Sequence, residues 1–527
     1  MKRSIILASI LVAAVVRAQP GATPAGEDAS TPTVDEDLTN GEAKSMLPVK
    51  LEDLILIAVR VSPDLARARV DRTVAVHNAQ AARHIMGWTF TANLAANATG
   101  TGDQIEVPEF GVVEQDTLSG TFGFGRALPI GGSITLNAGI QQQHSEYALT
   151  DTDIGTTVMA MGSGAPEESF NTQTSIGFTY KQSLGRGFGS VSELEIKKAD
   201  LQETDATVKA QTAAEDTIRD IVTAYWELAY STYEVDVRVQ ALELAKKQEQ
   251  LTHEQIRAGL AQPPALNPVT YELMTRQDDE LQAENDLEKK SMDLRQKVGL
   301  DLKKRDIVLH PADDFTIVDE EFDVGQILEK SRTSNRKLAT IAIEERLADL
   351  DVEQARDAAK PLIDAQVSAA YIGNADSVAN SLGAVRDGYQ LGASVNMSFD
   401  LSFTAKHSAQ AAEAKRRRIT IDRDDTMRQI ESQTALSAKQ VKTAKTRVEL
   451  GKKAMEISEE NVRATRLQFI AGKEDNFKVL ARQKDLTEAR LKYGRAIADY
   501  HIAVAQLQYL SGFLLDQYGV DVKSHER

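Results

Sequence analysis

The chain has 527 residues, a formal charge of −17 at pH 7 and no cysteine. The acidic balance disfavours nucleic-acid binding, which requires Lys and Arg to neutralise phosphates. The lack of cysteine excludes disulfides, thiolate metal sites and an acylated cysteine anchor.

Residues 1–18 have the pattern of a secretory signal, with basic residues followed by an apolar core from Ile5 to Val16. This core is shorter than the roughly 20 apolar residues that span a bilayer. With a cut after Ala18, the mature chain begins at Gln19 and carries a charge of −20, because three basic residues are lost. Residues 19–48 lack apolar periodicity and are predicted to be a disordered lead-in.

Residues 49–323 are predicted to form a first structural repeat. It opens with two helices that Ser62-Pro63 separates, since Pro fits the first turn of a helix. From about residue 88 to residue 184 the apolar period changes to two, which indicates β-strands. A long helix at 190–259 and a shorter helix at 269–298 follow.

The strand region contains four alternating segments whose loops differ in length. A tight turn at Pro129–Gly132 joins the second and third segments, whereas Gly100–Thr117 and Asp151–Asn171 are long loops. Bacterial membrane barrels combine short periplasmic turns with long outer loops. We therefore expect the first strand to run outward and the fourth to return to the periplasm.

The second half repeats the order of the first. Leu65-Ala66 and Ala82-Arg83 recur as Leu338-Ala339 and Ala355-Arg356 at one offset of 273 residues. In both halves the glycine that ends the short helix also comes 40 positions after the glycine that ends the long one. A tandem duplication explains this agreement.

This second repeat is predicted to span residues 324–515. It has strands at about 362–403, a long helix at 405–471 and a short helix at 476–510, and residues 516–527 are a C-terminal tail. Apolar residues recur every seven positions along both long helices, as helices that pack lengthwise against neighbours require.

The clearest strand is Tyr389–Phe403, in which every odd residue is apolar and every even residue is small or polar. At about 3.3 Å per residue it would reach about 50 Å, which favours a transmembrane barrel strand over the alternative, a strand of a soluble sandwich. The side chains expected to face lipid are Tyr389, Leu391, Val395, Met397, Phe399 and Leu401. With four strands in the first half and two in the second, one chain has six. Small closed membrane barrels need at least about eight strands, so an oligomer is predicted.

The residues suggest no catalytic, metal or cofactor site, so we expect no enzyme. His253-Glu254-Gln255-Ile256-Arg257 has Arg257 where a zinc-protease helix would carry its second histidine. The basic run Lys415–Arg418 has acidic residues nearby and is interpreted as a solvated helix face.

From about Val49 to Leu515, the order of helices, strands, long helix, glycine break and short helix resembles the TolC-type outer-membrane efflux protein family. Short sequence segments also resemble those of this family: Ala224-Tyr225-Trp226 early in the first long helix, Leu467–Gly472 at a helical tip and Ser183–Gly187 at a strand exit. The resemblance implies a mixed α and β fold. In that fold a trimeric outer-membrane β-barrel continues into a long α-helical coiled-coil tunnel across the periplasm.

The function that the resemblance implies is the exit duct of a tripartite efflux pump or a type I secretion system. The implied partners are two further copies of the chain, outer-membrane lipid, a periplasmic adaptor and an inner-membrane pump of RND, ABC or MFS type. The alternative is a barrel-anchored scaffold that spans the periplasm without transport. The transported substrate stays undetermined, because a wide water-filled tunnel selects weakly.

The resemblance implies three further expectations about particular residues. Gly259, Leu260 and Gly472 form the tips that contact the adaptor. A candidate periplasmic gate comprises Glu474, Asp475 and Lys478; the alternative is that the two acids favour a helix N-terminus. Family members usually give about four strands per chain and about twelve per trimer. The hairpin Leu118–Tyr147 is thus additional, and it widens the barrel or extends from its rim.

Overall fold

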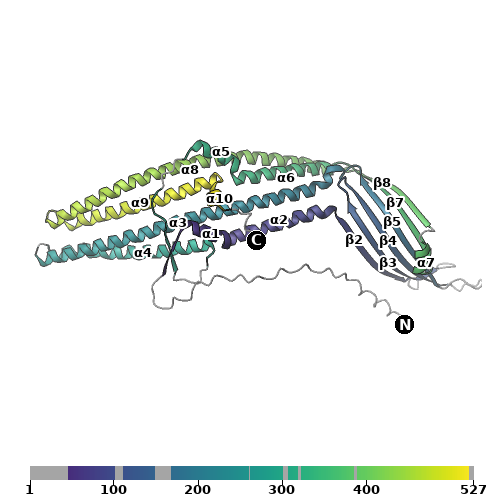
Figure 1. Ribbon diagram of the computed structural model, residues 1–527, viewed down its shortest axis with the longest axis horizontal. Helices are drawn as coiled ribbons and strands as arrows, with labels where there is room; N and C mark the ends of the chain where they lie inside the picture. Colours follow the sequence, from purple (N-terminus) through teal and green to yellow (C-terminus); the bar gives the residue numbers. More distant parts are fainter. Residues whose placement is uncertain are drawn as a thin grey trace, which may run out of the picture. The chain divides into compact units, whose positions relative to one another are not determined.

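The computed structural model describes residues 45–100, 111–148, 168–259, 261–300, 307–317, 322–384 and 388–520 (Figure 1). The chain divides into two units, Met1–Ser45 and Met46–Arg527, and the second contains the fold described below. The predicted signal and most of the predicted lead-in lie outside the described residues.

The helices agree with the periodicity of the sequence. Pro63 occupies the first turn of α2, as its fixed φ and missing N–H favour. The described helices are α1 (Leu51–Val61), α2 (Pro63–Arg83), α3 (Leu194–Arg257), α4 (Asn267–Val298), α5 (Val324–Ser334), α6 (Arg336–Ala358), α7 (Val378–Gly383), α8 (Thr404–Ile470), α9 (Asn476–Leu510) and α10 (Leu514–Gln517). The short 3₁₀ turns are η1 (His84–Met86), η2 (Gly189–Glu193) and η3 (Pro263–Leu266).

Eight strands form two sheets in the described residues. The strands are β1 (Ser45–Val49), β2 (Trp88–Gly100), β3 (Gly111–Ala127), β4 (Gly132–Ala148), β5 (Glu168–Ser183), β6 (Ile307–Pro311), β7 (Leu362–Ala375) and β8 (Gly388–Ser398). The large sheet has the order β2-β3-β4-β5-β7-β8, and all its pairs are antiparallel. The predicted hairpin 118–147 is therefore part of this sheet.

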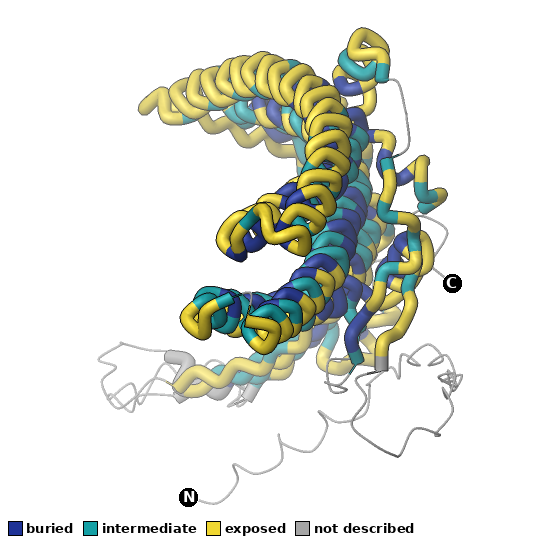
Figure 2. The backbone as a smooth tube through the Cα atoms, turned by 90° about the vertical axis from the view of Figure 1, so that its left-hand side faces the viewer, coloured by how far each residue is buried: buried dark blue, intermediate teal, exposed yellow. Residues whose placement is uncertain are grey.

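The two halves of the chain pack as matching sets of helices. In Figure 1, α3 with α4 and α8 with α9 are antiparallel pairs, and α2 and α6 lie beside the sheet-proximal parts of α3 and α8. Contacts of α3 with α6 and α9 join the halves. Figure 2 shows that buried residues concentrate where helices pack together, while other helical faces are exposed.

The main core lies where α1, α3, α4, β6 and α10 meet. Tyr225 is fully buried there, and its hydroxyl donates to Asp313 Oδ2 at 2.6 Å. The ring of Trp226 stacks on that of His501 in α9 at 3.6 Å between centroids. The aromatic pair noted in the sequence thus joins three parts of the chain and is structural.

Several predicted boundaries differ from the structure. The predicted lead-in is wrong for its last residues, because Ser45–Val49 forms β1 and pairs with β6, a strand that was not predicted. Strand β3 begins at Gly111 and β5 at Glu168, inside the predicted loops. The predicted tail includes the end of α10, where Leu515 is buried.

Candidate functional site: the strand wall and the helix tips

The large sheet has one apolar and one polar face. Directly opposed residues of paired strands point to the same face, and the register places Phe90 opposite Phe124, Phe124 opposite Leu136, and Leu136 opposite Phe178. The apolar face continues over β7 and β8. Its exposed members are Trp88, Phe90, Leu94, Leu118, Phe122, Phe124, Leu136, Ile176, Phe178, Val367, Tyr371, Tyr389, Leu391, Val395 and Met397, each between 41% and 77% exposed.

The opposite face consists mainly of neutral polar residues and glycine. Representative members are Thr91, Asn93, Thr121, Asn137, Gln141, Ser175, Thr179, Ser368, Gln390 and Ser394. Within the described strands the charged residues of this face are Lys181 and Asp364, which form an ion pair at 2.8 Å. A sheet with such faces can separate hydrocarbon from water.

The predicted lipid-facing strand is shorter in the structure. Tyr389, Leu391, Val395 and Met397 lie in β8 on the apolar face, but β8 ends at Ser398. Phe399 and Leu401 are exposed beyond its end, so their assignment to the strand is wrong.

Asp400 accounts for the early end of this strand. Its carboxylate accepts hydrogen bonds from the backbone N–H of Ser402 at 3.0 Å and of Ala405 at 2.9 Å. Asp competes in this way with strand and helix hydrogen bonding and favours a turn. Phe403 then adopts a positive φ of 57° and precedes α8.

The two predicted tips have the same geometry. Gly259 and Gly472 both follow the end of a long helix with φ of +69°. The N–H of Gly259 donates to the carbonyl of Ile256, and that of Gly472 to the carbonyl of Phe469, both at 3.0 Å. This left-handed glycine ends a helix at low steric cost. Leu260 lies outside the described residues.

The three predicted gate residues lie at the start of α9. The Asp475 side chain accepts from the backbone N–H of Lys478 at 3.0 Å and caps the helix. The ammonium of Lys478 lies 2.6 Å from the Glu474 carboxylate. Within one chain, therefore, these charges serve the helix N-terminus, where acids are favourable.

A buried polar cluster beside the tips was not predicted. Asn476 at the start of α9 accepts from the side-chain amide of Gln248 at 2.6 Å and donates to the hydroxyl of Thr252 at 3.2 Å. All three side chains are buried. The cluster joins the α3–α4 hairpin to the α8–α9 hairpin. Its residues are far apart in sequence, and no local pattern indicates it.

Exposed apolar side chains also surround the tips. They come from the end of α8 and the first turns of α4 and α9: Leu467, Ile470, Phe477, Tyr271 and Met274, each at least 59% exposed. Their exposure favours a contact with another molecule.

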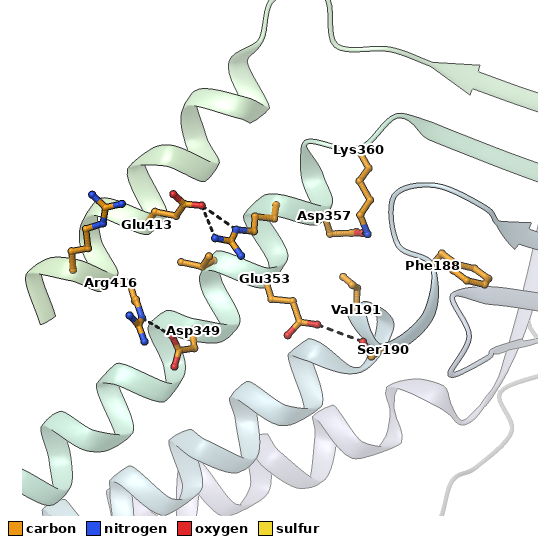
Figure 3. Close-up of a pocket in the computed structure, with 12 residues that line it drawn as sticks. Phe188, Ser190, Val191, Asp349, Glu353, Asp357, Lys360, Glu413 and Arg416 are labelled. Carbon is orange, nitrogen blue, oxygen red and sulfur yellow. Dashed lines mark hydrogen bonds and ion pairs between the residues drawn. The ribbon is translucent and has the colours of Figure 1, made fainter. Parts of the chain in front are cut away.

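Figure 3 shows the junction between the sheet and the helices, where α6, α8 and η2 enclose an open cavity of about 690 Å³. Its charges are largely paired: Arg356 with Glu413 at 2.8 Å, and Arg416 with Asp349 at 2.7 Å. Asp357 accepts from the N–H of Gly187 at 2.6 Å. These contacts fix the strand exit onto the helices and assemble no set of catalytic groups.

Two further observations concern the described residues. They contain no group of three or more His, Cys, Asp or Glu side chains that could hold a metal ion. Among the described helices, none combines the length and hydropathy that a membrane crossing requires.

Comparison with known proteins gives a family for the second half. The model of the family described as "Outer membrane efflux protein" matches residues 327–512. Over this stretch the chain is similar to outer membrane efflux proteins. The matched stretch includes β7, β8 and the α8–α9 hairpin, and the match confirms the resemblance that the order of elements indicated. No curated protein matches the sequence.

Solved structures of outer membrane proteins share the fold of most of the chain. VceC from Vibrio cholerae is 14% identical, with 88% of this chain and 96% of VceC covered and a TM-score of 0.65. The Campylobacter jejuni CmeC outer membrane channel is 11% identical, with 90% of this chain and 87% of CmeC covered and a TM-score of 0.66. The open Neisseria gonorrhoeae MtrE outer membrane channel is 13% identical, with 88% and 89% covered and a TM-score of 0.63. The mixed helix and sheet fold is thus that of outer membrane channels.

Proposed function

We propose that the protein is the exit duct of a tripartite efflux pump or a type I secretion system. It conducts solutes passively from a periplasmic pump complex to the exterior. The two-faced sheet carries the proposal, because an apolar outer surface and a neutral polar inner surface are what a water-filled channel through lipid requires. The proposed location is the outer membrane, with the helices in the periplasm.

A homotrimer is the proposed working form. Helix α8 carries a second apolar stripe, in which Leu436, Leu450 and Ile457 fall on a seven-residue spacing. Each is at least 57% exposed in the single chain. Such a stripe supports lengthwise packing against a neighbouring copy.

The tips are the proposed contact for a periplasmic adaptor, which links the duct to an inner-membrane pump. Their exposed apolar residues support this role. We expect Gly259→Glu with Gly472→Glu to abolish adaptor crosslinking and export, because a glutamate at φ of +69° is strained and would distort both tips. Crosslinking and export at wild-type levels in this variant would contradict the assignment.

The gate is proposed to lie at the same end, where the Asn476 cluster keeps the two helical hairpins together. Asn476→Ala removes the acceptor of the buried Gln248 side-chain amide, at a cost of about 1–3 kcal/mol for a buried unsatisfied group. The Thr252 hydroxyl still donates to the Gln248 backbone carbonyl at 2.8 Å. Glu474 and Asp475 remain candidates for an acidic collar. Unchanged cation selectivity in Glu474→Gln with Asp475→Asn would remove that role.

Single-channel conductance of the purified trimer in a planar bilayer tests the function. We expect a small conductance in the wild type and a severalfold larger one in Asn476→Ala. The control is Asn285→Ala, which removes an exposed asparagine of α4. No conductance in the wild type or in Asn476→Ala would exclude the duct and favour a barrel-anchored scaffold.

A further inference from the structure

The β3–β4 hairpin has the same two faces as the strands on either side of it. On the apolar face Phe122 of β3 lies between Ala92 of β2 and Ala138 of β4. On the polar face Thr121 lies between Asn93 and Gly139. A hairpin that projected from a rim into water would not need an apolar face aligned with that of its neighbours. The hairpin's two faces therefore indicate that it is part of the proposed barrel wall, meaning the six-stranded sheet that would separate lipid from the lumen.

The tight turn of this hairpin is also attached to the strand-to-helix junction. Ile130 O accepts from Gln182 Nε2 at 2.9 Å and from the N–H of Gly189 at 3.2 Å. Gly131 has φ of +82°, and a side chain there would collide with the carbonyl of Gly187. The turn is therefore fixed at the level where β5 leaves the sheet for α3.

The six-stranded sheet has two edges that are unpaired within the described chain, β2 and β8. Both carry exposed apolar side chains, including Phe90 and Leu391. Open edges do not persist in lipid, because their backbone N–H and C=O groups lack partners. The two edges run in opposite directions, since an antiparallel sheet with an even number of strands ends on strands of opposite direction. Each edge thus matches the other edge of a second copy.

We propose that β2 of one copy pairs antiparallel with β8 of the next, and that three copies close a barrel of eighteen strands. This inference rests on the homotrimer proposed above. Diameter grows roughly linearly with strand number. The barrel is therefore about 1.5 times as wide as one closed by three four-stranded sheets, with about twice the cross-sectional area.

The inner surface of this barrel indicates the class of cargo. Its described residues are mainly hydroxyl and amide side chains, glycine and alanine, and its two charges, on Lys181 and Asp364, neutralise each other. A wide, neutral and hydrated path suits bulky hydrophilic solutes of either charge. The strand section is expected to admit larger neutral polymers than a twelve-stranded barrel, with no marked preference for anions or cations.

Cysteine pairs test the proposal, because the native chain has no cysteine to interfere. Asn93→Cys in β2 is combined in turn with cysteine at each polar-face position of β8 from Gln390 to Ser398 in the full-length protein in membranes. At least one pair should give disulfide-linked dimers and trimers. Thr135→Cys with Thr179→Cys joins opposed residues of β4 and β5 and should give an intrachain disulfide.

Asn93→Cys with Ser175→Cys is the matched counter-test. Asn93 and Ser175 are separated by β3 and β4 in the sheet and meet only if the hairpin leaves the wall. A disulfide in this pair would overturn the eighteen-stranded barrel while leaving the duct intact. The absence of every intermolecular disulfide in protein that conducts ions would have the same meaning. Copy-to-copy disulfides in a protein without conductance would support the barrel and contradict the duct.

Discussion

At the scale of single residues, the burial of the Glu215 carboxylate in α3 lowers the stability of the fold when the group is charged. It is buried, and Arg336 Nε lies 3.3 Å from its Oε1. Burial raises the pKa of Glu215 to about 7, although Arg336 opposes the shift. Between its ordinary pKa of 4.5 and about 7, the folded chain retains a proton that the unfolded chain has released. The free energy of unfolding therefore falls as pH rises through this window.

Replacement of this carboxylate should make stability less dependent on pH. We expect Glu215→Gln to raise the melting temperature at pH 8 and to change it little at pH 4.5, because the amide avoids burial of a charge. The gain at pH 8 is at most about 3 kcal/mol from the size of the pKa shift. Melting of the detergent-purified protein from pH 4.5 to 8 measures this. Glu284→Gln, an exposed glutamate of α4, is the control, and equal pH profiles for wild type and Glu215→Gln would refute the prediction.

At the scale of elements, the approach of α9 to α3 depends on a missing side chain. Gly494 is buried, and a Cβ atom there would overlap the ring of Tyr233. Gly494→Ala should therefore separate the two helices or displace the ring, with a loss of about 1–3 kcal/mol. A lower melting temperature is the expected result. Gly383→Ala in α7, where a Cβ would meet nothing within 4 Å, should leave it unchanged; an equal loss in both variants would argue against specific packing at Gly494.

The same scale shows what the sequence can predict. Alternation identified β2, β4, β7 and β8, because their two faces differ sharply in polarity. It missed the outer part of β3, where Glu114, Gln115 and Asp116 are polar on both faces. Strand β6 has five residues, too few for periodicity to decide. The Asn476 cluster depends on which helices meet, and this information resides in tertiary packing rather than in any local segment.

At the scale of the whole molecule, the apolar stripe of α8 should decide whether chains assemble. Leu450→Gln with Ile457→Gln is expected to shift the purified protein from trimers toward monomers in native mass spectrometry. Burial of each such side chain contributes about 2 kcal/mol. Lys452→Gln, at an exposed position of the same helix, should leave the trimer intact. A stable trimer in the double variant would show that this stripe is no interface.

The position of the β3–β4 hairpin has a consequence for how such proteins can change over time. The hairpin adds two neighbouring strands to the sheet without altering where β2 begins or where β5 meets α3. One added strand would bring the chain back at the opposite end of the sheet, whereas a pair preserves every downstream connection. The bore of the proposed barrel can thus evolve in steps of two strands per chain, independently of the helices that carry the proposed adaptor contact.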